Sequence, residues 1–141
     1  MPIYLDTHAW IWWVTQDRRL SRRARSIIQN SSRREGVWIS AISIWEVAKK
    51  TEKKQLVLDR PLRQWLDLAL GVKGLHIAEL TAAILIESCE LPPPFPGDPA
   101  DQIIAATVRH HSARLVTKDR ELHRYIPVSY THLTLPTILR V

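Results

Sequence analysis

The stretch Pro2-Ile3-Tyr4-Leu5-Asp6 decides the fold of this chain of 141 residues. Its apolar run is too short for a helix, which is typical of a buried strand, and it ends on a carboxylate. Val37-Trp38-Ile39-Ser40 repeats this form, and Arg114-Leu115-Val116-Thr117 does so again shortly before Asp119. We therefore expect a sheet whose buried strands deliver polar residues at their C-terminal ends.

Helical patterns separate these strands. Ile44, Val47, Ala48 and Thr51 recur with the period of a helix that packs one face on a core. Caps and apolar stripes predict further helices over residues 20–30, 61–70, 81–87, from 98–99 onward and over 119–124, while 75–77 form a short strand or an extended link. The proline-rich segment 91–97 excludes a helix and predicts a rigid connector. This alternation predicts an α/β fold with a central parallel sheet and helices on both faces.

Length and composition indicate one domain with its own core. The single cysteine, Cys89, cannot form an internal disulfide, which favours a reducing compartment and a structural thiol. No signal-like leader or long apolar run is present, so we expect a cytoplasmic protein without membrane contact. Twenty Lys and Arg against fourteen Asp and Glu give a net charge of +6, which favours nucleic acid as a partner but also serves simple solubility.

Carboxylates stand where this sheet would present a ligand site. Such sites lie beyond the C-terminal ends of parallel strands, and Asp6, Glu46 and Asp119 are expected to emerge there, with Asp101 near the start of a helix. Carboxylates crowded at one edge repel one another unless positive charge lies among them. Oxygen ligands suit Mg²⁺ or Mn²⁺, whereas zinc prefers His or Cys at motif spacing, which the six histidines lack.

Each carboxylate also has a structural alternative. Asp6, Asp98 and Asp119 are all placed to cap helices. Glu46 fits a capping box with Ser43, or an i,i+4 ion pair with Lys50.

Asp101 shares a helical stripe with Ala105 and Val108, which turns it toward the buried face. An unpaired carboxylate is costly there, so Asp101 is the position that most needs a cation.

Other residues suggest contacts with a substrate. Basic side chains are candidate phosphate contacts, above all Arg22, Arg23, Lys49 and Lys50, together with Arg18, Arg19, Arg25, Lys53 and Lys54, although solvation alone would explain them. His8 is two residues from Asp6 and could touch the substrate, with packing or exposure as the alternative. The tryptophans near Asp6 (Trp10, Trp12 and Trp13) could stack on bases, but core packing or a partner interface fits them better.

Four blocks, taken in order, resemble the signature of the PIN-domain ribonucleases, specifically the VapC-like toxins of type II toxin–antitoxin pairs. They are Leu5-Asp6-Thr7-His8-Ala9-Trp10, Ser40-Ala41-Ile42-Ser43-Ile44-Trp45-Glu46-Val47, Gly97-Asp98-Pro99-Ala100-Asp101-Gln102-Ile103-Ile104-Ala105-Ala106-Thr107 and Leu115-Val116-Thr117-Lys118-Asp119. Each block is weak alone, but four in sequence at suitable spacing form a specific signal.

The resemblance implies a three-layer α/β/α PIN-like fold and a metal-dependent endoribonuclease. By it, Asp6, Glu46, Asp101 and Asp119 form the acidic catalytic quartet, with Asp6 and Asp101 as the principal Mg²⁺ ligands and Asp98 as a lesser candidate. It further implies an RNA substrate cleaved to a 5′-phosphate and a 3′-hydroxyl, a cognate antitoxin protein and a homodimer.

The C-terminal segment departs from this pattern. The likeness covers residues 1–127, whereas residues 128–141 do not look like the short last strand with which such proteins finish. This segment resembles a translated adapter sequence, so we expect a PIN-like nuclease domain over 1–127 and an atypical, non-native tail over 128–141.

Two other functions compete with the nuclease. A catalytically inactive RNA-binding or antitoxin-binding PIN module is the main alternative, and intact carboxylates at all four positions argue against it. A phospho-acceptor receiver or a dehalogenase-like phosphatase also places acids at strand ends, but the first strand lacks the paired aspartates or the Asp-x-Asp that those chemistries require.

Overall fold

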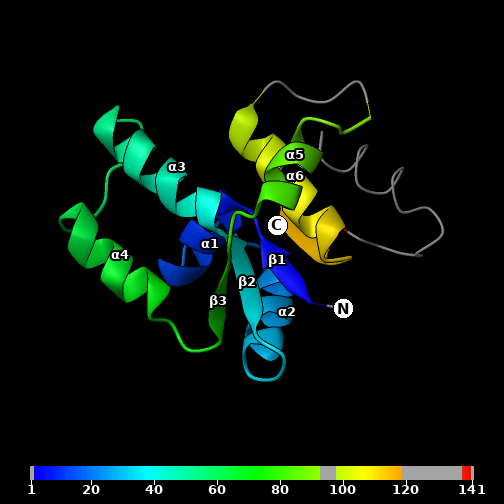
Figure 1. Ribbon diagram of the computed structural model, residues 1–141. Helices are drawn as coiled ribbons and strands as arrows, with labels where there is room; N and C mark the ends of the chain where they lie inside the picture. Colours follow the sequence, from blue (N-terminus) through cyan, green and yellow to red (C-terminus); the bar gives the residue numbers. More distant parts are fainter. Residues whose placement is uncertain (1, 93–97, 119–137, 141) are drawn as a thin grey trace.

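The computed structural model describes residues 2–92, 98–118 and 138–140. Five parallel strands form one sheet in the order β3-β2-β1-β4-β5 (Figure 1). The strands are β1 (Ile3–Leu5), β2 (Val37–Ser40), β3 (Leu75–Ala78), β4 (Arg114–Thr117) and β5 (Ile138–Arg140). The helices are α1 (Thr7–Val14), α2 (Arg22–Ser32), α3 (Ala41–Glu52), α4 (Leu62–Leu70), α5 (Ala82–Ser88) and α6 (Pro99–His110).

Helices cover both faces of the sheet, which confirms the predicted three-layer α/β/α fold. Strand side chains alternate between the faces, so that Leu5 and Val116 belong to one core and Tyr4 and Leu115 to the other. The first core is completed by α1, α2, α3 and α4. The second is completed by α6, against which α5 packs.

The strand order places a binding crevice at one defined position. β2 and β3 are added on one side of β1, whereas β4 and β5 are added on the other side. In open α/β sheets, ligands bind beyond the C-terminal ends of the strands where the chain switches sides, here between β1 and β4. Asp6 follows β1 and Lys118 follows β4, so both residues lie at this switch point.

Most local predictions are confirmed with boundary shifts of one or two residues. Ser21 caps α2 by accepting a hydrogen bond from the Ala24 backbone N–H at 3.1 Å, and residues 75–78 form a strand rather than a link. Most of the predicted connector (93–97) and the predicted helix over 119–124 lie outside the described residues.

Other features differ from the sequence-based expectation. The sequence does not predict β5, which belongs to the atypical C-terminal segment and pairs with β4 in parallel register. Cys89 is exposed, so the prediction of a structural thiol is wrong. Trp10, Trp12 and Trp13 are all buried in the first core, which confirms core packing for them. Within the described residues, no helix has the length and apolar character needed to cross a membrane.

Candidate active site

A cavity of about 310 Å³ lies at the switch point of the sheet. Four separate parts of the chain line it: the start of α1, the middle of α3, the start of α6 and the residue after β4. The lining residues are Asp6, Thr7, His8, Glu46, Lys50, Asp98, Asp101 and Lys118. The fold therefore gathers four of the five carboxylates named from sequence, whereas Asp119 lies outside the described residues.

Asp6 is the most deeply placed of these carboxylates, with 6% of its surface exposed. It caps α1, because its Oδ1 accepts a hydrogen bond from the Ala9 backbone N–H at 2.7 Å. Its Oδ2 accepts a hydrogen bond from the Thr117 hydroxyl at 2.5 Å, which joins the ends of β1 and β4. The capping alternative is thus confirmed, yet a carboxylate has about four acceptor sites, so these bonds do not exclude a further ligand.

Burial raises the pKa of Asp6 to about 6. Desolvation of the charged carboxylate is the main cause, and the negative charge of Glu46 adds to it. Hydrogen bonds from Thr117, Ala9 and the backbone of Lys118 oppose this rise without cancelling it. Asp6 is therefore a poorly compensated negative charge that a cation in the cavity would stabilise.

Glu46 approaches the same cavity from α3. Its carboxylate accepts a hydrogen bond from the Thr7 hydroxyl, and its Oε2 lies 3.7 Å from Lys50 Nζ, which confirms the i,i+4 pair. The capping-box alternative is wrong, because α3 begins at Ala41 and is capped by Ser40, whose hydroxyl accepts a hydrogen bond from the Ile42 N–H at 3.2 Å. Ser43 is instead fully buried, with its Oγ 2.9 Å from the Thr7 hydroxyl.

Asp98 and Asp101 approach from the N-terminus of α6. Asp98 is exposed and caps the helix, since its Oδ1 accepts a hydrogen bond from the Ala100 N–H at 2.9 Å. Asp101 is half-buried in the first turn, while Ala105 and Val108 on its stripe are fully buried. The prediction that Asp101 lies on the buried side of its helix is therefore correct, although its side chain stays partly exposed at the cavity.

Two lysines bring positive charge to the carboxylates. Lys50 pairs with Glu46, whereas Lys118 is exposed and places its Nζ 5.4 Å from the centre of the Trp12 ring. Together they are two cations against four carboxylates in the lining. Lys118 is not among the site residues predicted from sequence, although its position directly after a strand indicates that it lies at the C-terminal edge of the sheet.

His8 lies in the cavity, as one of the sequence hypotheses allows. Its ring makes an edge contact with Trp12 at 5.9 Å between centroids. Burial, with the charges of Lys50, Lys118 and Arg19, lowers the pKa of His8 to about 4, so the imidazole is neutral near neutral pH. A neutral His8 offers the substrate a hydrogen bond without adding charge.

The other basic residues named from sequence lie in different places. Lys49 pairs with Glu52 at 3.0 Å and does not line the cavity. Arg22 and Arg23 are exposed on α2, and Arg22 lines a separate groove.

The donor set fits a hard divalent cation. In the described part of the chain, no three Asp, Glu, His or Cys side chains stand close enough together to form a ready metal cluster. Mg²⁺ does not require one, because it is usually held by one or two carboxylates and keeps several water molecules. A water-accessible cavity lined by separate carboxylates, one of them desolvated, matches that preference.

Comparison with known proteins agrees with this arrangement. Residues 3–126 match the PIN domain family. The chain is 39% identical to "Ribonuclease VapC22" of Mycobacterium tuberculosis over 126 residues, which cover 87% of this chain and 92% of that protein.

Solved structures share the fold at low identity. DNA-bound VapBC from Salmonella typhimurium has a TM-score of 0.66 at 20% identity, covering 90% of this chain and 93% of that one. VapBC2 from Rickettsia felis, bound to a promoter DNA fragment, has a TM-score of 0.62 at 18% identity, and the match covers 99% of this chain and 97% of that one. With the family match over nearly the whole domain and the switch-point carboxylates in place, the chain belongs to the PIN domain family, in its VapC branch.

Proposed function

We propose that the protein is an endoribonuclease that hydrolyses RNA phosphodiester bonds with Mg²⁺ or Mn²⁺ in the switch-point cavity. The observation that carries the proposal is the convergence of Asp6, Glu46 and Asp101 from three distant segments on one cavity. Membership of the VapC branch of the PIN family supports the same reaction.

The residues of the cavity have distinct roles in this proposal. Asp6 and Asp101 hold the cation, and Glu46 and Asp119 complete the site, with Asp98 as a lesser ligand. When bound, the cation supplies Lewis-acid activation of water and neutralises charge that develops on the phosphate. Glu46, which Thr7 and Lys50 hold in place, orients the attacking water and accepts its proton. Lys50 and Lys118 attract the phosphate.

The proposal includes an antitoxin partner. Several similar structures are toxin–antitoxin complexes, among them the VapBC assemblies and a "Toxin-antitoxin complex from Klebsiella pneumoniae". We infer that this chain is the toxin of such a pair and that a small cognate protein neutralises it.

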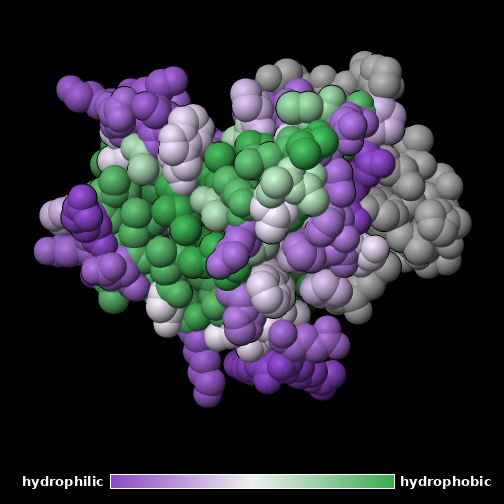
Figure 2. Space-filling view, in the orientation of Figure 1, coloured by the Kyte–Doolittle hydropathy of each residue, from purple (hydrophilic) through white to green (hydrophobic). Residues whose placement is uncertain are grey.

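A homodimer completes the proposal. Trp45 on α3 and Leu85 and Ile86 on α5 are 54%, 42% and 59% exposed, and Figure 2 shows apolar residues over the face that carries α3, α4 and α5.

Replacing Ile86 by Lys is expected to weaken self-association at least tenfold, because an unpaired charge buried in an apolar interface costs more than about 1.4 kcal/mol. Sedimentation velocity across a concentration series measures this. The matched control is Val57→Lys, which places a lysine at an exposed position outside α5. Equal dimerisation of wild type, Ile86→Lys and Val57→Lys would contradict a dimer through α5.

The Asp101→Asn variant tests the reaction. It is expected to cleave RNA at least about 100-fold more slowly than wild type with Mg²⁺, because an amide replaces a charged ligand. The measurement is the initial rate of cleavage of a labelled RNA in Mg²⁺, in Mn²⁺ and in excess chelator. Expression in cells is a second readout, in which wild type is expected to arrest growth and the variant is not.

A change at the lesser ligand and a control on a distant surface separate the role of Asp101 from general effects of charge. Asp98→Asn keeps its cap, since Asn caps helices as well as Asp, and is expected to retain cleavage within about tenfold. Asp67→Asn lies on the exposed surface of α4 and is expected to match wild type. Cleavage that is equal in Asp101→Asn and wild type, or unaffected by chelator, would overturn catalysis by a cation in this cavity. Absence of cleavage by wild type would favour an inactive binding module.

A further inference from the structure

We propose that a basic groove at the far end of α1 from the cavity binds the phosphate backbone of the RNA at a distance from the cleaved bond. The basic groove is an opening of about 1360 Å³ whose lining includes Arg18, Arg22, Arg25, Arg33 and Lys73. This inference rests on the proposed ribonuclease function and extends it by assigning substrate contacts to a second surface.

The charge of the groove points to a polyanion. The described residues that line it include these five cations and no Asp or Glu. Arg18, Arg22, Arg33 and Lys73 are exposed, and none of them forms an ion pair with another described residue. Positive side chains with no carboxylate among them create a potential that attracts phosphates.

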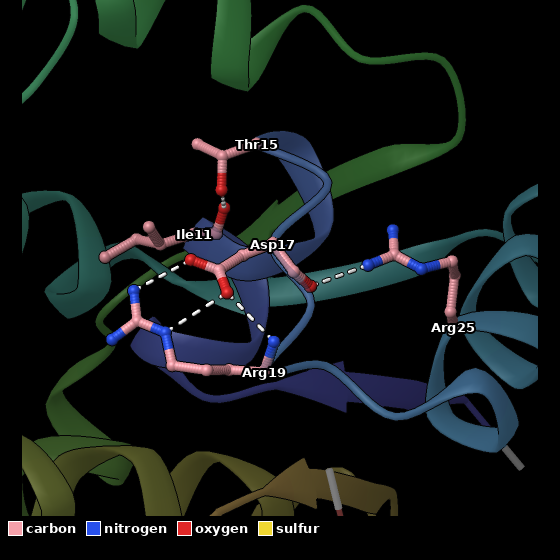
Figure 3. A network of polar contacts seen from close by, with 5 residues as sticks. All are labelled: Ile11, Thr15, Asp17, Arg19 and Arg25. Atoms are coloured by element: carbon pink, nitrogen blue, oxygen red, sulfur yellow. Dashed lines mark hydrogen bonds and ion pairs between the residues drawn. The ribbon is translucent and has the colours of Figure 1, made fainter.

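A polar network beside the groove leaves these charges available (Figure 3). The Asp17 carboxylate binds Arg19 through Oδ2 to Nη2 at 2.7 Å and through Oδ1 to Nε at 3.1 Å, so its charge is compensated by Arg19. Arg25 donates a hydrogen bond from Nη2 to the Asp17 carbonyl at 2.8 Å, which fixes the turn between α1 and α2. The wall of the groove is therefore held in place while Arg18 and Arg22 remain exposed.

The surface of the groove favours RNA over an apolar protein partner. Its apolar lining includes Trp13 and Leu20, which are only 8% and 3% exposed and already packed in the core. Val14 and Val72 in the lining are half-buried, whereas every fully exposed lining residue is cationic or amide-bearing, as at Gln16 and Gln29. Phosphate and sugar groups need such donors, whereas an apolar helix would need exposed apolar area.

The distance between the two sites sets a minimum substrate length. Asp6 caps the N-terminus of α1, and Gln16 lies just beyond the C-terminus of this eight-residue helix. At 1.5 Å per residue the helix spans about 12 Å, which is about four nucleotides at 3.4 Å each. Only an RNA that extends at least this far beyond the cleaved bond reaches both sites.

The test uses a groove variant with a matched control. The groove variant is Arg18→Gln/Arg22→Gln/Arg33→Gln, and the control is Arg34→Gln/Arg60→Gln/Arg63→Gln, which removes three exposed charges that line neither site. Binding is measured by fluorescence anisotropy in excess chelator, so that the RNA stays intact. The probes are single-stranded RNAs of about 25 and about four nucleotides, each at several salt concentrations.

The groove variant is expected to bind the long RNA at least about tenfold more weakly than wild type. The slope of log affinity against log salt is expected to fall by about 2, the value for three lost contacts to a single strand. The affinity of the control variant for both RNAs is expected to stay within twofold of wild type. Cleavage of the long RNA by the groove variant should slow, while cleavage of the short RNA should not.

Other results would overturn the assignment. Equal losses in the groove and control variants would mean that net charge alone acts. Unchanged RNA affinity with loss of binding to a co-expressed antitoxin would assign the groove to a protein partner. If wild type cleaves long RNA no faster than the groove variant does, the RNA-binding role of the groove is rejected and the proposed ribonuclease function stands. If wild type neither binds nor cleaves RNA, both the role of the groove and the ribonuclease function are rejected.

Discussion

Asp6→Asn is expected to lose RNA cleavage by at least about 100-fold while unfolding at a higher temperature than wild type when no divalent cation is present. Loss of activity follows from the proposed role of Asp6 as a charged cation ligand at the switch point. The gain in stability follows from removing a buried charge that the folded protein compensates poorly. A residue that served only to stabilise the fold would not combine these two effects.

The size of the stability gain follows from the pKa of Asp6. Folding raises this pKa from 3.8 to about 6, and each unit corresponds to about 1.4 kcal/mol, so the carboxylate costs the folded state about 3 kcal/mol near neutral pH. Asn has nearly the same shape, caps helices as well as Asp and still accepts the Ala9 hydrogen bond. The free energy of unfolding of Asp6→Asn should therefore exceed that of wild type by most of this 3 kcal/mol.

The sign of the pH dependence follows from the same shift. The folded protein holds the Asp6 proton more tightly than the unfolded chain, so the cost appears as the pH rises from about 4 to 6 and is fully present above 6. The stability difference between Asp6→Asn and wild type should be largest near pH 7 and should vanish below about pH 4. Denaturant titrations at these two pH values measure it.

Added Mg²⁺ should remove most of the difference in stability between wild type and Asp6→Asn. A ligand that binds only the folded state at 100 times its Kd stabilises it by about 2.7 kcal/mol, and wild type should gain this stabilisation while Asp6→Asn gains little. Asp67→Asn changes an exposed residue of α4, so its cleavage rate and its stability with and without Mg²⁺ should match those of wild type. An active Asp6→Asn, or one that is inactive because it has lost stability, would contradict the role given to Asp6.

Trp10→Ala is expected to destabilise the protein by about 3–5 kcal/mol, because it leaves a large cavity in a close-packed core. Trp10 is fully buried, and its ring packs edge-on against the ring of Trp65 with 5.6 Å between the ring centroids. This contact links α1 to α4. Folded domains are stable by about 5–15 kcal/mol, so this loss is enough to unfold a large fraction of the molecules near 37 °C.

Thermal and urea denaturation of the Trp10 variant measure this loss. The control is Trp45→Ala, since Trp45 is 54% exposed and its removal should change the stability of the monomer by less than about 1 kcal/mol. Equal destabilisation by the two substitutions would contradict the central place of Trp10 in the first core.

The sequence by itself determines the alternation of strands and helices, because the period of apolar residues is a local property that burial enforces. It also determines that Asp6 emerges at the C-terminal edge of the sheet, since all strands of a parallel sheet end on the same side. Caps such as Ser21 and Asp98 can be read for the same reason, because their hydrogen bonds reach only two or three residues along the chain.

Tertiary structure alone decides which charges meet. Its position after a strand places Lys118 at the edge of the sheet, but nothing in the local sequence shows that it shares a cavity with Glu46, or that Arg22 lies in a different groove from Lys50. These neighbours depend on strand order and on how α3 packs between α1 and α6, which involve residues far apart in the chain. The same is true of the pKa of Asp6, since desolvation is a property of the completed core and not of the residues beside it.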